Sequence, residues 1–383
     1  MIAPQAPQIN PAREAARAQA QALRLRGMEF HAKGELQTAL DLLLQARAIA
    51  PEAPVIHLNL GQTYERLNDT DAATRAYFLA VTKARRQGLW LDEASVPPSL
   101  LPHVLHAMQF VARHRDEVLL RLLEPHETRF GASNLMRVRQ ALDVYLERDL
   151  SKPASPQQRP LFMYVPGLTE TPYLAKERFD WVEKALAAQA EIAAEAQAVL
   201  SMRAGLEAFL RVDNPAELGN YLAGSNASPR WDAYFFYRHG RAYTEHLSAC
   251  SATAKFLQDF PKVHIESHAP EICFSVLAPG THILPHTGVT NSRVVAHLPL
   301  LLPGQCALKV AGVERAWCMD EVLIFDDTFE HEAWNNATQP RVILLMDAWH
   351  PDLSEPEQIA LAALVEGIGV FNRGEAIASE PGH

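Results

Sequence analysis

The chain has 383 residues, of which 48% are hydrophobic and 21% charged, and it carries a formal net charge of −10 with a pI near 5.9. A single hydrophobic core usually stops growing at roughly 250–300 residues, so a chain of this length is expected to form two domains. The acidic balance argues against a nucleic-acid partner, and the lack of any run of about 18 apolar residues argues against a membrane span.

The N-terminal residues and the cysteines bear on the compartment. Residues 1–26 combine prolines with an Ala/Arg/Gln-rich helical pattern and have no apolar core of the roughly 7–15 residues that a signal peptide needs. The four cysteines are far apart and follow no CxxC spacing, which is typical of reduced thiols. Together these features predict a cytoplasmic protein.

A repeat with an offset of 34 residues occupies the N-terminal part of the chain. Small and large apolar residues recur at that offset in five matched pairs: Gly27/Gly61, Phe30/Tyr64, Ala39/Ala73, Leu43/Tyr77 and Ala46/Ala80. Small residues allow two helices to approach, and the large ones fill the space between them. The pattern therefore predicts two consecutive helix pairs.

The spacing over residues 20–87 resembles the tetratricopeptide repeat, although Leu23 stands where that repeat usually has tryptophan and Arg26 where it has leucine. Two repeats need neighbouring helices to cover their ends. The candidates are Leu101–Arg113, Asp116–Leu123 and Asn134–Arg148, which gives a helical domain over residues 12–150. Two interpretations stay open for it, a concave surface for a peptide or protein partner and a helical packing arm.

Residues 151–160 contain three prolines with Ser and Gln, a composition that predicts a linker. A second domain is expected over residues 161–355, followed by a C-terminal helix and tail over 356–383. It should begin with a strand at Leu161–Leu168 and a long helix at Lys176–Leu210. Five further strands are predicted at Cys273–Leu277, Val294–Leu302, Ala307–Val310, Glu321–Phe325 and Val342–Ala348. Short strands with Pro-Gly turns favour a jelly-roll barrel with helices outside it, so the chain as a whole is multidomain α + β.

Two of the sixteen histidines stand out by their context. His286 follows a short apolar run and opens a Gly-Thr-Asn turn, and His331 lies between a Phe-Asp-Asp segment and Trp334. Neutral imidazole is a suitable ligand for non-haem iron, whose usual protein set adds a carboxylate two residues after the first histidine. That position is Gly288. Either a third ligand comes from elsewhere in the chain, or water takes its place.

Other residues around this pair are suited to bind an anion. Arg341 opens a predicted strand and can form two parallel hydrogen bonds to a carboxylate, and Ser275 on another strand can add a hydroxyl donor. Arg293 and His297 share the parity of one predicted strand, so both should face the same side of the sheet. The group is consistent with an anion site beside a metal site.

The motif His286-x-Gly288-x-x-Asn291-x-Arg293-x-x-x-His297, with Phe325-Asp326-Asp327-x-x-x-His331 after it, resembles the aspartyl/asparaginyl β-hydroxylase family. The closing segment from Arg341 through Asp347 and Trp349 to Pro351 is similar to the end of that family's domain. The resemblance runs from about Tyr164 to about Leu353.

The resemblance implies a double-stranded β-helix fold and an oxygenase that depends on Fe(II), 2-oxoglutarate and O2. Transferred by position, His286 and His331 are the iron ligands, and this family uses only two protein ligands. Arg341 and Ser275 would bind the distal carboxylate of 2-oxoglutarate, with His297 near its iron-bound end. Val295 stands where some members have a second arginine, which Arg293 would replace.

Three acidic residues precede His331. Asp326, Asp327 and Glu330 could accept a hydrogen bond from an imidazole N–H, although a solvated position in a turn is the simpler interpretation for Asp327 and Glu330.

The main hypothesis from the sequence is hydroxylation of the β-carbon of an Asp or Asn side chain, in a peptide or in an amino-acid-derived metabolite. One alternative is halogenation or another C–H oxidation at the same iron, because Gly288 leaves room for a halide. Another is a scaffold protein that works through its tetratricopeptide-like repeats and has an inactive oxygenase domain.

Overall fold

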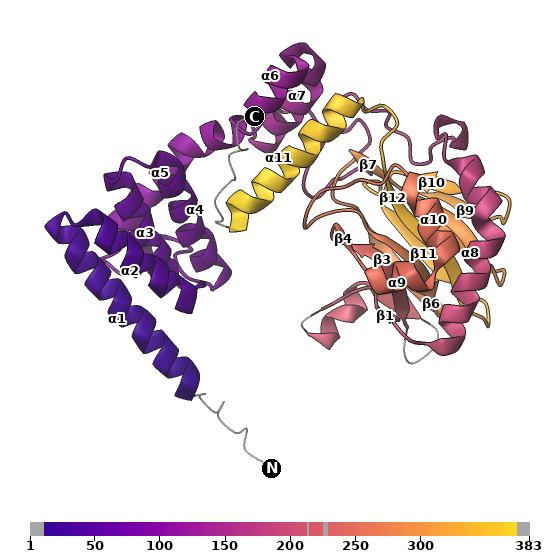
Figure 1. Cartoon of the computed structure of the whole chain (residues 1–383), viewed down its shortest axis with the longest axis horizontal. Helices are drawn as coiled ribbons and strands as arrows, with labels where there is room; N and C mark the ends of the chain where they lie inside the picture. The colour runs from indigo at the N-terminus through magenta and orange to yellow at the C-terminus, as the bar shows by residue number, and fades with distance from the viewer. Residues whose placement is uncertain (1–10, 213, 225–228, 374–383) are drawn as a thin grey trace. The chain divides into compact units, whose positions relative to one another are not determined.

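The computed structural model describes residues 11–212, 214–224 and 229–373, and the chain has mixed α/β structure. It divides into two compact units, one of residues 1–124 and 367–383 and one of residues 125–366 (Figure 1). Among the described residues, none of the helices has the length and apolar character needed to cross a membrane. The last ten residues of the predicted C-terminal helix and tail lie outside the described part.

The first unit is helical. Its helices are α1 (Pro11–Lys33), α2 (Leu36–Ile49), α3 (Pro54–Arg66), α4 (Thr70–Arg86) and α5 (Leu101–Leu120), with a 3-10 turn at Glu93–Ser95 and the C-terminal part of α11 (Glu355–Arg373). Helix α1 packs against α2, α3 against α4, and α4 against α5. The two stretches predicted at Leu101–Arg113 and Asp116–Leu123 are one continuous helix, so the predicted break between them was wrong.

The 34-residue offset has structural counterparts. A Cβ atom at Gly27 on α1 would lie 3.0 Å from Leu43 on α2, and a Cβ atom at Gly61 on α3 would lie 2.3 Å from the ring of Tyr77 on α4. Each glycine therefore lets one helix approach the large residue of the next. The sequence offset thus corresponds to two helix pairs packed in the same way.

The boundary between the units differs from the one expected at residues 150–161. Helices α6 (Glu124–Phe130) and α7 (Met136–Tyr145), with a 3-10 turn at Ala132–Leu135, fall almost wholly in the second unit. Arg137 on α7 forms a bidentate pair with Glu357, and Tyr145 lies 5.5 Å from Phe162, centroid to centroid. These contacts to the second unit outweigh the helical pattern that suggested a longer first domain.

The second unit contains two antiparallel sheets. The larger has the order β1-β3-β5-β12-β7-β10 with β4 paired to β3, and the smaller has the order β2-β6-β11-β8-β9. The larger sheet is made of β1 (Glu207–Ala208), β3 (Trp231–Arg238), β4 (Arg241–Ala242), β5 (Ile272–Leu277), β7 (Arg293–Leu301), β10 (Leu323–Phe325) and β12 (Arg341–Trp349). The smaller is made of β2 (Leu222–Gly224), β6 (Thr281–His286), β8 (Cys306–Val310), β9 (Val313–Ala316) and β11 (His331–Asn335).

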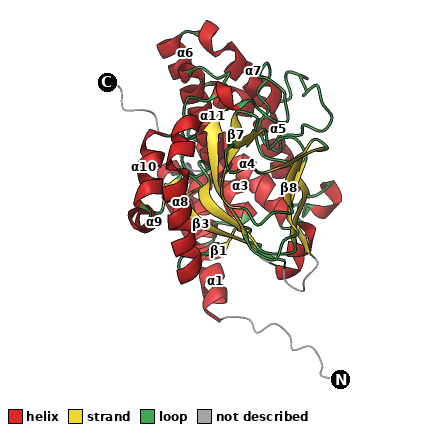
Figure 2. Cartoon of the chain, turned by 90° about the vertical axis from the view of Figure 1, so that its right-hand side faces the viewer, coloured by secondary structure: helices red, strands yellow, loops and turns green. Residues whose placement is uncertain are grey.

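The unit is layered. Helices α8 (Val182–Met202), α9 (Thr244–Ala249) and α10 (Ser251–Asp259) lie on one side of the larger sheet (Figure 2), and short 3-10 turns occur at Lys176–Arg178 and Pro215–Asn220. One apolar cluster joins α8 and α10 to the outer face of the larger sheet, through residues such as Ile192 and Leu344. A second cluster, including Ile343 and Leu308, lies between the two sheets. Strand alternation thus gives the larger sheet two buried faces.

The strands predicted in the C-terminal part agree with the structure better than the segments predicted before them. The five strands predicted between Cys273 and Ala348 are confirmed as β5, β7, β8, β10 and β12. The strand predicted at Leu161–Leu168 was wrong, because this stretch forms a single bridge at Met163 followed by a turn. The helix predicted at Lys176–Leu210 is shorter, since it begins at Val182 and ends at Met202. The other strands, β1 to β4, β6, β9 and β11, were missed.

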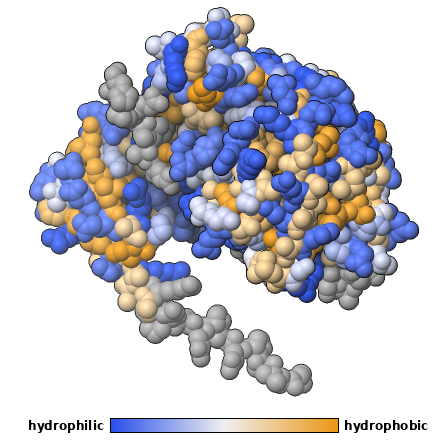
Figure 3. All heavy atoms as spheres, turned by 45° about the vertical axis from the view of Figure 1, so that its right-hand side comes forward, coloured by the Kyte–Doolittle hydropathy of each residue, from blue (hydrophilic) through white to orange (hydrophobic). Residues whose placement is uncertain are grey.

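The surface of the second unit mixes hydrophilic and apolar side chains, as the face turned to the viewer in Figure 3 shows. Several large apolar side chains stay exposed, among them Leu161, Val289 and Val313.

Candidate active site

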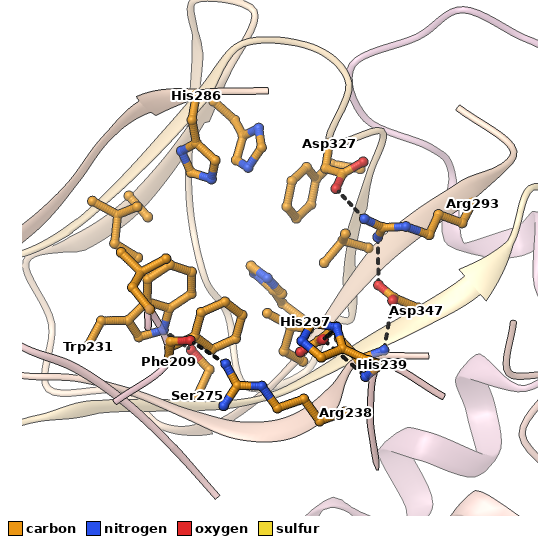
Figure 4. Close-up of a pocket in the computed structure, with 18 of the residues that line it drawn as sticks. Phe209, Trp231, Arg238, His239, Ser275, His286, Arg293, His297, Asp327 and Asp347 are labelled. Carbon is orange, nitrogen blue, oxygen red and sulfur yellow. Dashed lines mark hydrogen bonds and ion pairs between the residues drawn. The ribbon is translucent and has the colours of Figure 1, made fainter. Parts of the chain in front are cut away.

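A cavity of about 780 Å³ lies between the inner faces of the two sheets of the second unit. All six residues singled out in the sequence line it: His286 and His331 from the smaller sheet, and Ser275, Arg293, His297 and Arg341 from the larger. Among them, His286, Ser275, Arg293 and His297 are labelled in Figure 4. The predicted parity of Arg293 and His297 on one strand face is therefore confirmed.

The two histidines face each other across neighbouring strands. His286 ends β6 and His331 begins β11, the two residues are direct partners in the ladder, and their ring centroids lie 4.1 Å apart. Each Nδ1 is close to a carbonyl oxygen of its own chain two residues earlier, at 2.8 Å from Leu284 for His286 and 2.9 Å from Phe329 for His331. A carbonyl only accepts, so each Nδ1 carries a proton, and in the neutral form of either ring the lone pair is on Nε2.

This tautomer is the one in which histidine binds a metal through Nε2. Burial, and to a smaller degree the neighbouring His286, lowers the pKa of His331 to about 4, so its imidazole is neutral near pH 7. Within the described residues there is no cluster of three or more His, Cys, Asp or Glu side chains that could hold a metal ion. The residues present fit a metal held by two imidazoles.

Position 288 explains why no carboxylate follows His286. A Cβ atom built on Gly288 would lie 2.2 Å from the carboxyl carbon of Asp327, so the Asp327 side chain occupies the space that a side chain at 288 would need. The backbone N–H of Gly288 donates to the carbonyl of Asp327 at 2.6 Å. Asp327 is only 6% exposed, so the interpretation of it as a solvated turn residue was wrong.

Arg341 is a buried cation without a protein counter-ion in the described chain. It is 1% exposed, its Nε and Nη1 have no hydrogen-bond partner, and its guanidinium lies 4.8 Å from the ring centre of Trp317. Burial lowers its pKa to about 10. An unpaired buried charge is strongly unfavourable, so this position is suited to an anionic ligand that enters the cavity.

Two more side chains near Arg341 have donors to offer. The indole Nε1 of Trp231 donates to the Ser275 hydroxyl at 2.9 Å, which leaves the Ser275 proton for another acceptor. Trp317 Nε1 approaches His297 Nδ1 at 3.3 Å; indole only donates, so His297 carries its proton on Nε2. Burial and Arg341 lower the pKa of His297 well below its usual value, which keeps this ring neutral.

Arg293 lines the same cavity but is held by two protein carboxylates. Its Nη1 donates to Asp347 at 2.7 Å and its Nη2 to Asp327 at 3.0 Å. Val295 lies between Arg293 and His297 on the same strand face and lines the cavity as well. The guanidinium of Arg293 is thus held between two carboxylates, and the contact from its Nη2 orients Asp327.

The comparisons with known proteins agree with this geometry. The family model described as aspartyl/asparaginyl β-hydroxylase matches residues 187–351, which include all six cavity residues. Residues 187–351, which make up most of the second unit, thus match the aspartyl/asparaginyl β-hydroxylase family.

The relatives of this chain differ in how much of it they cover. It is 36% identical to the human aspartyl/asparaginyl beta-hydroxylase over 135 residues, which is 35% of this chain and 18% of that protein. It is 28% identical over 250 residues to the aspartate beta-hydroxylase domain-containing protein 2 of Mus musculus, and 26% over 253 residues to that of Xenopus tropicalis. These matches cover 64% and 65% of the chain, and 70% and 65% of the two relatives. The chain thus spans less than a fifth of the human enzyme.

The acids before His331 do not all act as the sequence suggested for a β-hydroxylase-like site. Asp326 accepts hydrogen bonds from Thr328 and from the Gln158 amide. The imidazole Nδ1 of His331 donates to the Phe329 carbonyl, so the predicted hydrogen bond from that ring to Asp326 was wrong. Glu330 is the solvated residue expected, because its side chain is 43% exposed beside Arg159.

Sequence reasoning missed Trp231 and Gln158. Trp231 precedes the region that carries the motif by more than forty residues, and Gln158 lies in the segment predicted to be a linker. Both act through contacts to residues distant in sequence, Ser275 and Asp326, which no local pattern reports.

Proposed function

We propose that this chain is an Fe(II)- and 2-oxoglutarate-dependent hydroxylase that acts on the β-carbon of an Asp or Asn side chain, in a peptide or an amino-acid-derived substrate. The observation that carries the proposal is the buried, unpaired Arg341 in the same cavity as two imidazoles whose Nδ1 atoms face carbonyl oxygens, so that each Nε2 is available to a metal. The family model that matches residues 187–351, and the names of the relatives, support a hydroxylase.

In this proposal each cavity residue has one task. His286 and His331 hold the iron, and Arg341 with the Ser275 hydroxyl binds the distal carboxylate of 2-oxoglutarate. The Nε2–H of His297 is a donor for the other end of the cosubstrate, and the unpartnered Oδ1 of Asp327 accepts from a group beside Gly288. Iron with 2-oxoglutarate supplies the oxidation, in which one atom of O2 enters the substrate and the other enters succinate as CO2 is released.

The fold suggested by the resemblance is part of the same proposal. Two antiparallel sheets that enclose a cavity are consistent with a double-stranded β-helix, in which facing strands place ligands in the mouth of the barrel. The equivalent packing of Gly27 and Gly61 is consistent with tetratricopeptide-like helix pairs. Such pairs would present a surface for a protein partner.

The carboxylate of Asp327 bears on the alternatives. Because it fills the space beside Gly288, a halide there would lie against a negative charge, which disfavours halogenation. A scaffold that binds no ligand would keep the unfavourable buried charge of Arg341 without compensation.

Anaerobic titration with Fe(II) and 2-oxoglutarate tests the cofactor assignment. We expect a visible metal-to-ligand charge-transfer band that is lost in His331→Ala, whereas no band from the intact protein would refute the proposal. The matched control is His264→Ala, which changes a histidine outside the cavity lining and should leave the band unchanged.

The reaction is tested by mass spectrometry of peptides and metabolites incubated with the protein, iron and 2-oxoglutarate. We expect products that gain one oxygen atom and depend on His286. A chlorinated product formed only with chloride would favour halogenation instead.

A further inference from the structure

A segment outside the two sheets runs alongside both metal-site histidines. We call residues 157–163 the strap. On one side, Arg159 N donates to the Thr328 carbonyl at 2.7 Å and the Gln157 carbonyl accepts from Glu330 N at 2.9 Å. On the other side, Leu161 N donates to the Gly288 carbonyl at 3.1 Å. The composition of residues 151–160 predicted a linker, but the part from Gln157 onward is hydrogen-bonded to the site.

The segments that the strap joins are the ones that carry the site. Phe162 N and Met163 N both donate to the Val289 carbonyl, at 2.9 and 3.1 Å, which extends the contact along the turn after His286. The opposite contacts reach the residues directly before His331. The strap therefore links the turn of one proposed iron ligand to the approach of the other through backbone bonds.

Gln158 is the strap side chain that bonds to the loop before His331. It is 3% exposed, and its Nε2 donates to Asp326 Oδ2 at 2.9 Å and lies 3.2 Å from Thr328 Oγ1. Asp326 in turn accepts from the N–H and hydroxyl of Thr328. Burial disfavours a charged carboxylate and raises the pKa of Asp326 to about 7. Hydrogen-bond donors such as these offset part of that cost. The Gln158 amide thus holds the carboxylate of Asp326 in place, and Asp327 is the next residue of the same loop.

Asp327 transmits this position to the metal site. Its carboxylate occupies the space at Gly288 and accepts from Arg293, and its carbonyl accepts from the N–H of Gly288. A shift of the loop 326–328 would therefore move both the carboxylate beside the metal position and the start of strand β11. In metal sites, loss of such supporting hydrogen bonds typically weakens metal binding about 10- to 100-fold.

We propose that the strap, residues 157–163, is a positioning element of the metal site, in which the buried amide of Gln158 sets the place of Asp327 and His331 relative to Gly288 and His286. This inference rests on the proposed function, because it assigns the strap to the same iron site. Gln158 is not among the residues that line the cavity, and its amide bonds to Asp326 and Thr328, so it acts through these two residues.

The test compares two glutamines in the 383-residue chain. Gln158→Met keeps the volume of the side chain and removes the donor. Gln189→Met is the matched control, since Gln189 on α8 is part-buried and donates to the Pro299 carbonyl at 2.7 Å, away from the cavity lining. For both variants, the Kd of Fe(II) in the presence of 2-oxoglutarate is measured anaerobically from the charge-transfer band, with the Tm as a separate readout.

We expect Gln158→Met to raise the Kd of Fe(II) by about tenfold or more and to shift the band, while Gln189→Met lowers the Tm without a change in Kd. Equal Kd values for the wild type and Gln158→Met would overturn the strap's role but leave the proposed function intact. No Fe(II) binding by the wild type would overturn both.

A second variant covers the case in which Gln158→Met does not fold. Gln158→Asn keeps an amide but shortens the side chain by one methylene, so that its donor no longer reaches Asp326 with good geometry. It should raise the Kd in the same direction, and an unchanged Kd would again count against the strap.

Discussion

The unpaired charge of Arg341 leads to a prediction about stability. Removal of this charge should stabilise the ligand-free protein but abolish the stabilisation that an anionic ligand gives. Burial lowers the pKa of its guanidinium to about 10, a shift that corresponds to roughly 3 kcal/mol of unfavourable free energy for the charged form. Replacement of a buried ion pair by apolar side chains of similar volume is often neutral or stabilising by about 1–4 kcal/mol, and a buried charge that lacks a partner should gain at least as much. The Arg341→Met variant should therefore be more stable than the wild type when no ligand is present.

The ligand should reverse that order. A ligand at 100 times its Kd stabilises the folded state by about 2.7 kcal/mol. For a domain of about 150–250 residues, each kcal/mol moves the Tm by roughly 2–4 °C. With Mn(II) as a redox-stable stand-in for iron, saturating 2-oxoglutarate should thus raise the wild-type Tm by about 5–10 °C. The same addition should leave the Tm of Arg341→Met almost unchanged.

Thermal unfolding with and without Mn(II) and 2-oxoglutarate measures both effects. Arg148→Met is a suitable control, because this arginine is half-exposed and pairs with Asp143 at 3.5 Å, so it should alter neither the Tm of the free protein nor the ligand shift by much. An Arg341→Met protein that is less stable than wild type and still shifts with 2-oxoglutarate would refute the assignment of Arg341 as the anion partner.

Three further predictions test other parts of the site. Gly288→Ala places a Cβ against the Asp327 carboxylate and should cost about 1–3 kcal/mol in urea unfolding and weaken Fe(II) binding, and a variant as stable as wild type would contradict the packing. Trp231→Phe removes the donor to Ser275 and should raise the KM for 2-oxoglutarate more than it lowers kcat, which steady-state kinetics would show. Burial lowers the pKa of His350 to about 4, so the unfolded chain takes up a proton at a higher pH than the folded protein does. The free energy of unfolding should therefore fall by up to about 2 kcal/mol from pH 7 to pH 5. The variant His350→Gln should flatten this pH dependence, and an unchanged slope would exclude His350 as its source.

Local sequence patterns identified much of the site because its residues lie on strands. Alternation along β7 places Arg293 and His297 on one face, and that parity can be read from the chain without a structure. The apolar runs that became β5 and β12 are buried on both faces, so their composition was informative. The pair of histidines and Arg341 followed from residue type and spacing.

Strands β6 and β11 were harder to predict. They carry His286 and His331, and their burial alternates with polar residues such as His282 and Glu332, which form a surface pair at 2.7 Å. Short strands with mixed faces resemble loops in composition. Their assignment depends on pairing with each other, which is a long-range contact.

The sequence by itself determined the helical character of the N-terminal part, five strands of the C-terminal part, the 34-residue offset and the residue types that a metal and an anion need. Only the tertiary structure decided that Asp327 fills the space at Gly288, that Arg293 is held by two carboxylates, and that the predicted linker contributes Gln158 to the site. These three results share one physical reason. Each depends on the partners that a buried charge or amide finds across more than thirty residues of chain, and such partners are set by packing rather than by local preference.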